Sequence, residues 1–142
     1  MILIDANLFL YASLRELPRH PQARAWLEEV LNGDQLVGLP WMVVLAVLRI
    51  STNPRVLQQP LPAHQALGLI EGWLDHPLVQ TIEPGPGHWA ILRMLLAQAG
   101  TAANLTNDAH LAALAIGNDA VLYSADNDFK RFRGLRHRDP LR

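Results

Sequence analysis

The sequence predicts an α/β fold with a mostly parallel sheet that helices cover on both faces. Short, uniformly apolar segments of strand length alternate with longer segments whose apolar residues recur at helical spacing. The 142 residues, half of them apolar, are enough for one core and leave no room for a second domain. Because no repeat, low-complexity tract or linker interrupts this pattern, we expect a single domain over residues 1–142.

The first segment predicts a strand followed by a helix. Ile2–Ile4 is an apolar run typical of a short buried strand. Asn7 can accept a hydrogen bond from the first turn of a helix, so we expect it to N-cap a helix from Leu8 to about Leu14. Pro18 ends this unit, because proline cannot continue a helix.

Proline and glycine residues delimit the next elements. Pro21 suits the first turn of an amphipathic helix that Gly33 ends. A strand is expected at Gln35–Leu39, and the following helix, Trp41–Ile50, is apolar on nearly all sides. Such a helix belongs in a core or at a subunit interface. The next predicted elements are a helix over residues 66–74 and a strand over residues 78–82.

Two more helices and one more strand are predicted in the remaining residues. Apolar residues at helical spacing indicate a helix from Trp89 to Ala99, which a glycine ends. Asp108 opens an apolar helix that runs to Gly117. The strand-like residues 120–123 then lead into a turn that ends at Phe129.

Four aspartates lie at the ends of these elements. Asp5 follows the first strand, Asp108 opens the last helix, and Asp126 and Asp128 follow the last strand. A carboxylate at the edge of a buried element costs free energy unless a positive group meets it. In helix-covered parallel sheets, ligands bind outside the carboxyl ends of the strands, where Asp5 and Asp126 are expected to lie.

Clustered carboxylates need a counter-charge. Two of them about 4 Å apart repel by about 4 kcal/mol at an effective dielectric constant of about 20. Magnesium and manganese prefer oxygen ligands, whereas zinc favours histidine-rich sets that the six histidines here do not form. His110 is interpreted as a surface or core histidine of its helix. The aspartates therefore predict Mg²⁺, with Mn²⁺ as a substitute, and metal-assisted attack on a phosphodiester.

Each aspartate also has a structural interpretation. Asp108 can stabilise a helix N-terminus through the backbone dipole, by about 0.3 to 1 kcal/mol. Residues Asp126–Asp128 can form a hydrogen-bonded turn that caps a short helix near Phe129. Asp5 is harder to explain in this way, because no lysine or arginine neighbours it in the sequence.

The sequence lacks the motifs that other classes of phosphate-binding and hydrolytic enzymes require. No GxxxxGK loop occurs, no GxGxxG follows a strand, and no cysteine is present to act as a nucleophile. A phosphatase that forms an aspartyl-phosphate needs a second aspartate where Asn7 stands, and a lysine near the phosphoryl group. Lys130 is the only lysine. A phosphatase-like hydrolase therefore ranks last among the enzyme hypotheses.

With a net charge of −1, the chain does not have the overall positive field of a protein that coats nucleic acid. The distribution of its charges is more informative. Six of the twelve basic residues lie in the last thirteen positions, with only Asp139 opposing them. This segment is either a solvated, frayed end or a cationic flank that holds a polyanion beside the carboxylates. The six residues are Lys130, Arg131, Arg133, Arg136, Arg138 and Arg142.

The sequence shows no sign of export or of membrane insertion. It contains no cysteine, and no basic leader precedes the first apolar stretch. Its longest apolar run, Leu39–Leu48, is far shorter than the roughly 20 residues that a membrane helix needs. We therefore expect a cytoplasmic protein that does not enter a membrane.

Four motifs, in order, resemble those of the PIN-domain ribonuclease toxins called VapC. They are Asp5-Ala6-Asn7, the segment LRISTNPR at 48–55, the segment NDAHLAALA at 107–115 and the segment SADNDF at 124–129. The resemblance spans almost the whole chain. It implies a three-layer α/β/α fold, magnesium-dependent cleavage of RNA, a homodimer, and inhibition by a co-expressed VapB-type antitoxin.

The resemblance also implies roles for single residues. Asp5 and Asp108 match the primary metal ligands, Asp126 matches the third catalytic acidic position, and Asp128 matches a carboxylate that often accompanies it as a ligand. Ser124, Asn7 and Arg49 match residues that support the site. Arg49 lies three residues beyond a position where many relatives carry glutamate, and that position is Ala46 here. One expected carboxylate is missing, so a single ion is expected rather than two unless Asp128 substitutes for that carboxylate.

The leading hypothesis is a toxic, Mg²⁺-dependent endoribonuclease of a VapBC-type toxin–antitoxin system. Ala46 keeps an alternative from another class open, namely a PIN-like module that binds RNA or a protein without cleaving it. The sequence identifies neither the RNA nor the cleavage site, because substrate choice depends on surface shape and charge.

Overall fold

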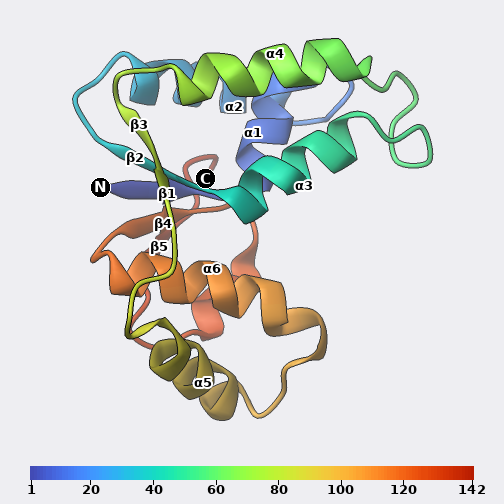
Figure 1. Ribbon diagram of the computed structural model, residues 1–142. Helices are drawn as coiled ribbons and strands as arrows, with labels where there is room; N and C mark the ends of the chain where they lie inside the picture. The colour runs from blue at the N-terminus through green and yellow to red at the C-terminus, as the bar shows by residue number, and fades with distance from the viewer.

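Five strands form the central sheet of the computed structural model, which describes all of residues 1–142 (Figure 1). The strands lie in the order β3-β2-β1-β4-β5, and every neighbouring pair is parallel. The carboxyl ends of all strands therefore lie at one edge, and β1 is central. The strands are β1 (Ile2–Ile4), β2 (Val37–Pro40), β3 (Val79–Ile82), β4 (Val121–Tyr123) and β5 (His137–Arg138).

Helices cover both faces of the sheet. Figure 1 shows α1, α2, α3 and α4 on one side of the sheet and α5 and α6 on the other. Helix α1 packs on α2 and α3, whereas α5 packs on α6. The predicted three-layer α/β/α sandwich is confirmed. The helices are α1 (Ala6–Ser13), α2 (His20–Leu31), α3 (Trp41–Ser51), α4 (Ala63–Leu74), α5 (His88–Ala99) and α6 (Thr106–Gly117), with short 3-10 helices η1 (Ala103–Leu105) and η2 (Asn127–Arg131).

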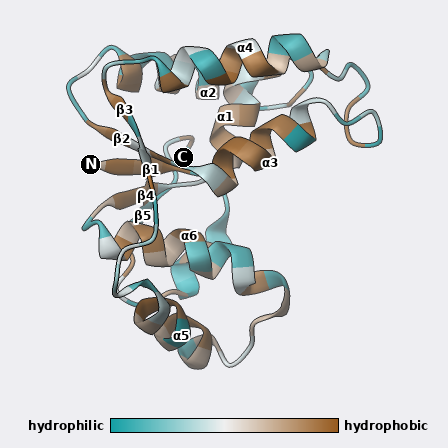
Figure 2. Ribbon diagram, viewed as in Figure 1, coloured by the Kyte–Doolittle hydropathy of each residue, from teal (hydrophilic) through white to brown (hydrophobic).

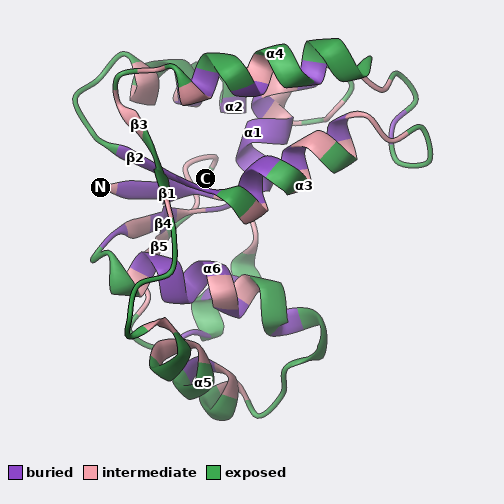
Figure 3. Cartoon of the chain, viewed as in Figure 1, coloured by how far each residue is buried: buried purple, intermediate pink, exposed green.

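Strands β1 and β2 are buried along their length, and β4 is buried at its centre. Leu3 and Ile4 of β1 and Leu122 of β4 are fully buried, and Leu39 of β2 is nearly so. Because helices cover both faces, these strands have no solvent side and are uniformly apolar rather than alternating. Figure 3 shows the buried residues concentrated in the sheet and on the helix faces that meet it.

Helices α3 and α5 each leave large apolar side chains exposed. On α3, Val43 and Val47 are buried, but Leu45 is 60% exposed. On α5, Leu95 is buried, but Trp89 is 69% exposed. Core packing therefore accounts for one face of each helix, and the apolar character of α3 in Figure 2 continues onto its exposed face. No helix combines the length and apolar character needed to cross a bilayer.

The predicted N-cap of the first helix is wrong by two residues. Helix α1 begins at Ala6 rather than Leu8, because the side chain of Asp5 accepts a hydrogen bond from the N–H of Ala6. Asp5 has the extended backbone typical of an N-cap. Asn7 lies inside the first turn, where its side chain is free to contact another segment.

The basic segment of the chain contains a strand that was not predicted. β5 pairs with β4, with His137 opposite Leu122 and Arg138 opposite Tyr123. Of the two interpretations of this segment, the frayed end is therefore wrong at these residues, and the cationic flank stays a prediction. A two-residue strand that contains histidine and arginine has neither the length nor the apolar pattern on which strand prediction depends.

Candidate functional site

Two neighbouring parallel strands end side by side at the edge where the aspartates are expected. β1 and β4 are in register, with Ile4 opposite Tyr123. The next residue along each strand is Asp5 in β1 and Ser124 in β4, so these two lie level with each other. The N–H of Asp5 donates to the carbonyl of Tyr123 at 2.9 Å.

The buried hydroxyl of Ser124 connects three segments at this edge. It donates to Asp5 Oδ2 at 2.7 Å, and it accepts from the N–H of Asp126 at 3.0 Å and from Asn7 Nδ2 at 3.2 Å. Asn7 Oδ1 accepts from the N–H of Ala125 at 3.4 Å. Ser124 therefore contacts the first aspartate directly, and Asn7 acts through Ser124.

Asp5 is held in place and largely removed from water. Burial raises the pKa of Asp5 above its usual value, hydrogen bonds from Ser124 and Ala6 oppose that increase, and the charge of Asp126 adds to it. The carboxylate is thus oriented by two donors but retains an unfavourable desolvation free energy. A cation beside it would lower that free energy.

Asp108 approaches the same region from the opposite layer. It lies in the first turn of α6, which packs on β4. Burial raises the pKa of Asp108 to about 6, and the charges of Asp5, Asp126 and Asp128 contribute to the increase. Two segments that are distant in sequence, the end of β1 and the turn after β4, therefore bring negative charge close to one half-buried carboxylate.

Asp126 and Asp128 belong to the turn after β4. Asp126 N-caps η2, and its Oδ1 accepts from the N–H of Asp128 at 2.9 Å. The prediction of a hydrogen-bonded turn that caps a short helix is confirmed. This local role leaves Asp126 Oδ2 without a hydrogen bond and Asp128 exposed, but neither residue lines the cavity that Asp5 and Asp108 share.

An open cavity of about 710 Å³ lies in front of Asp5 and Asp108. Helix α3 forms another wall, where Ala46 and Arg49 line the cavity one turn apart. Position 46 therefore faces the same cavity as Asp5 and Asp108, and with alanine there this wall has no carboxylate. The other residues that line the cavity are Met42, Leu45, Leu48, Thr52, Asn107 and His110.

The aspartates do not form a complete metal-ligand set. No group of three or more His, Cys, Asp or Glu side chains is arranged to enclose a metal ion by itself. The cavity offers two carboxylates, Asp5 and Asp108, that repel each other beside open space. This donor set fits a hydrated hard cation such as Mg²⁺, which binds through one or two carboxylates and keeps several waters.

Two histidines lie beside the aspartates but were not predicted as site residues. His137 Nε2 is 3.0 Å from the carbonyl oxygen of Ser124, and no sequence signal indicates it because β5 was not predicted. His110 lines the cavity, and its Nδ1 is 2.9 Å from Nε2 of His88. Burial, followed by the charge of His88, lowers the pKa of His110. The sequence signal that could have identified His110 as a site residue is its position two residues after Asp108.

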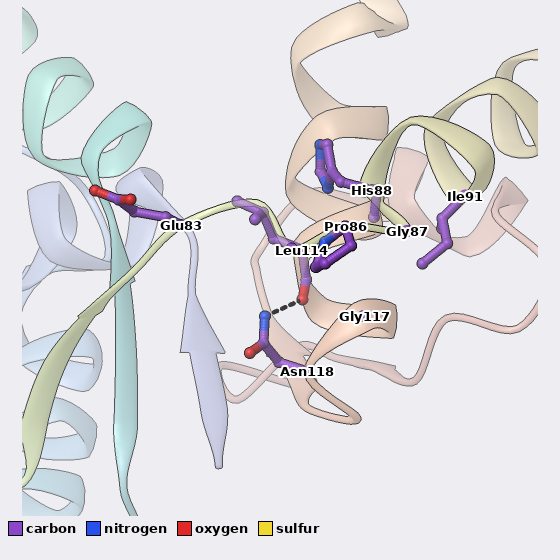
Figure 4. Close-up of a pocket in the computed structure, with 10 residues that line it drawn as sticks. Glu83, Pro86, Gly87, His88, Ile91, Leu114, Gly117 and Asn118 are labelled. Carbon is purple, nitrogen blue, oxygen red and sulfur yellow. Dashed lines mark hydrogen bonds between the residues drawn. The ribbon is translucent and has the colours of Figure 1, made fainter.

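A second cavity, of about 200 Å³, lies away from the aspartates (Figure 4). It lies between the segment 83–88 and the carboxyl-terminal half of α6, where Asn118 Nδ2 donates to the carbonyl of Leu114 at 2.8 Å. None of the predicted site residues lines it. The candidate site is therefore the larger cavity at the carboxyl edge of the sheet.

Known proteins match the whole length of this chain. The PIN domain family matches residues 2–135. The chain is 43% identical to ribonuclease VapC33 of Mycobacterium tuberculosis over 142 residues, which cover 100% of this chain and 99% of the relative. It is 39% identical to ribonuclease VapC37 of the same organism over 140 residues, which cover 99% of this chain and 97% of the relative.

A solved structure shows the same fold. VapBC2 from Rickettsia felis, bound to a DNA fragment from its promoter, matches with a TM-score of 0.69 and 19% identity, over 97% of this chain and 98% of that chain. At that identity the likeness concerns the fold alone, whereas the two ribonucleases match in sequence over their full length. This chain therefore belongs to the PIN-domain family and, within it, to the VapC ribonucleases.

Proposed function

We propose that this VapC-family protein is the toxin of a toxin–antitoxin pair and hydrolyses RNA phosphodiester bonds with Mg²⁺, for which Mn²⁺ can substitute. One observation carries the proposal. Asp5, at the end of β1, and Asp108, at the start of α6, line one open cavity together with Arg49. The names of the ribonucleases VapC33 and VapC37 support the choice of RNA as substrate.

The proposed ligands are Asp5, Asp108 and Asp126, with Asp128 as a fourth carboxylate. When bound, Mg²⁺ would polarise the scissile phosphate and lower the pKa of the attacking water. The reaction is a hydrolysis in which a water oxygen bonds to phosphorus, the bond from phosphorus to a ribose oxygen breaks, and the departing oxygen takes a proton. The carboxylates would hold the ion, and the chain's other residues would hold the carboxylates and the phosphate in position.

The remaining roles follow from the contacts. Ser124 fixes the orientation of Asp5 through the 2.7 Å hydrogen bond, and Asn7 fixes Ser124. Arg49 is the only arginine or lysine that lines the cavity, so its guanidinium can contact the phosphate and offset its charge. The apolar side chains Met42, Leu45 and Leu48 of α3 line the same wall of the cavity as Arg49.

The test is cleavage of RNA by the purified protein, with Mg²⁺, with Mn²⁺ and with a chelator. Cleavage that requires either metal supports the proposal. RNA binding that is independent of metal and leads to no cleavage would instead favour a non-catalytic PIN-like module. Release of inorganic phosphate from small phosphoesters would favour a phosphatase-like hydrolase. Sequencing the fragment ends after brief expression in cells would identify the RNA.

Replacing Ser124 by alanine should lower the cleavage rate about 10- to 100-fold, as the loss of a residue that orients a metal ligand commonly does. The substitution removes the donor to Asp5 and the acceptor for the N–H of Asp126. The measurement is the single-turnover rate with Mg²⁺. Ser13→Ala is the matched control, because Ser13 makes no side-chain hydrogen bond and lies at the far end of α1. Equal rates for the two variants would contradict the assigned role.

We also propose two partners, a second copy of this chain and a VapB-type antitoxin, and action in the cytoplasm. The exposed apolar residues Trp41 and Leu45 of α3 support a protein interface. Light scattering should give twice the chain mass of 15.8 kDa. Expression with the antitoxin should yield a stable complex without RNA cleavage. A monomer at all concentrations would remove the homodimer from the proposal.

A further inference from the structure

Asp139 is a buried carboxylate beside the candidate site that the mechanism does not use. Its side chain is only 7% exposed. Because Arg138 pairs with Tyr123, and Tyr123 with Ile4, three neighbouring strands end level with one another. Asp139 therefore follows β5 as Ser124 follows β4 and Asp5 follows β1.

The surroundings of Asp139 leave one of its oxygens without a hydrogen bond. Oδ1 accepts from the N–H of Leu141 at 3.0 Å. Oδ2 is buried without a hydrogen-bond partner, and its only salt bridge is to Arg142, whose Nε lies at 3.4 Å. A buried carboxylate of this kind holds a cation strongly in place, because separating the two would leave the charge desolvated and unpaired.

The same arginine reaches the acidic turn. With the Asn127 amide oriented to satisfy both partners, its side-chain oxygen accepts from Arg142 Nη1 and Nη2, each at 3.1 Å. Asn127 is the residue between Asp126 and Asp128. The guanidinium therefore joins a fixed point beyond β5 to the turn that carries two of the four carboxylates.

A second contact anchors the segment from the opposite side. Arg19, which immediately precedes α2, donates from Nη2 to the carbonyl of Leu141 at 3.3 Å. Residues 139–142 are thus held by the residue before α2, by β5 and by their own turn. In the acidic turn, the N–H of Asp126 donates to Ser124, whereas Asn127 and Asp128 are exposed.

We propose that Asp139 and Arg142 are positioning residues that fix the turn Asp126–Asp128 at the metal site. Asp139 orients Arg142, Arg142 holds Asn127, and the turn thereby keeps Asp126 and Asp128 directed at the region of Asp108. This inference rests on the proposed function, because it assigns these residues to the same metal-dependent site.

The experiment compares Arg142→Gln with Arg136→Gln. The side chain of Arg142 is 60% exposed, so its replacement leaves the core intact. Arg136 is a matched control: it is a neighbouring exposed arginine that pairs with Asp119 at 2.8 Å, in the loop after α6. Both variants lose one positive charge from the same basic segment, so a difference between them does not reflect general attraction of RNA.

Three measurements test the proposal: hydrogen exchange, Mn²⁺ binding and RNA cleavage. The first two do not require the protein to cleave RNA. In Arg142→Gln without metal, hydrogen exchange should become faster over residues 124–131. Mn²⁺ binding, followed by electron paramagnetic resonance, should weaken about tenfold, within the usual effect of removing a residue that supports a ligand. Cleavage should need about tenfold more Mn²⁺, with an unchanged KM for RNA. Arg136→Gln should match wild type in exchange and Mn²⁺ binding.

Further variants make the outcome decisive. Asn127→Ala should reproduce the effect of Arg142→Gln, and the double variant should be no worse than either single one, because both break the same contact. Arg142→Lys should restore part of the Mn²⁺ affinity. Unchanged exchange and Mn²⁺ binding in Arg142→Gln would overturn this inference while wild type still cleaves RNA. A wild type that binds Mn²⁺ but cleaves no RNA would overturn the proposed function instead.

Discussion

Replacing Asp108 by asparagine is expected to lower the rate of RNA cleavage about a thousandfold while the protein stays folded. Asp108 is one of only two carboxylates that line the cavity, and asparagine has nearly its shape without its charge. The variant should also be more stable than wild type in the absence of metal near neutral pH, because it removes a charge that burial desolvates and that Asp5, Asp126 and Asp128 repel. Loss of activity together with a gain in stability is the signature of a charged functional residue.

The measurements are single-turnover cleavage with Mg²⁺ and thermal unfolding with a chelator. Asp5→Asn should lose a similar factor, and the double variant should lose little more, because the two residues act as one unit. Asp34→Asn, a substitution at an exposed loop position, is the matched control and should cleave like wild type. Undiminished cleavage by Asp5→Asn and Asp108→Asn would refute the site.

The order of layers could be predicted from the sequence because buried parallel strands leave a plain pattern. Three apolar residues at 2–4 and four strand-like residues at 120–123 pack between two helix layers and include no charged residue. β5 could not be predicted in this way, because edge position and two-residue length remove both the apolar run and the alternation. Its pairing depends on the rest of the sheet rather than on its own residues.

The proximity of Asp5 and Asp126 follows from the topology of the sheet. Asp5 and the turn at Asp126 follow adjacent parallel strands, so a correct prediction of a parallel sheet places them at one edge. The detailed contacts do not follow in the same way. Asn7 fits the composition of an N-cap, but Asp5 takes that role and frees Asn7 to reach Ser124. Both Asp5 and Asn7 have side chains that can cap a helix. Which of them does so depends on the tertiary contact with Ser124, which the local sequence does not show.

The resemblance indicated Ser124 and Asn7 as supporting residues, but nothing in the sequence indicated the supporting residues of the basic segment. His137, Asp139 and Arg142 fall in a segment whose composition indicates only basic charge. Their proximity to the site depends on β5. This strand places His137 beside the carbonyl of Ser124 and places Asp139 level with the ends of β1 and β4. The basic segment therefore holds residues with different contacts: Arg142 reaches the acidic turn, whereas Arg136 pairs with Asp119.

Removing divalent metal is expected to abolish cleavage and to make the protein's stability depend on pH. The pKa of Asp108 is raised from 3.8 to about 6 in the folded protein, so between these values the folded state binds more protons than the unfolded chain. The stability of the metal-free protein should therefore fall as the pH rises through about 4 to 6 and then level off. The raised pKa of Asp5 acts in the same direction.

Added Mg²⁺ should reverse this loss, because it binds carboxylates only in their charged form. At about 100 times its Kd, Mg²⁺ adds about 2.7 kcal/mol, or about 5 to 10 °C in Tm for a domain of this size. The shift should be large at about pH 7.5 and small at about pH 5, where protons compete with the ion. In Asp108→Asn, both the pH dependence and the Mg²⁺ shift should shrink. Equal Mg²⁺ shifts in wild type and Asp108→Asn would show that the ion binds elsewhere, since a site without Asp108 would be unaffected by the substitution.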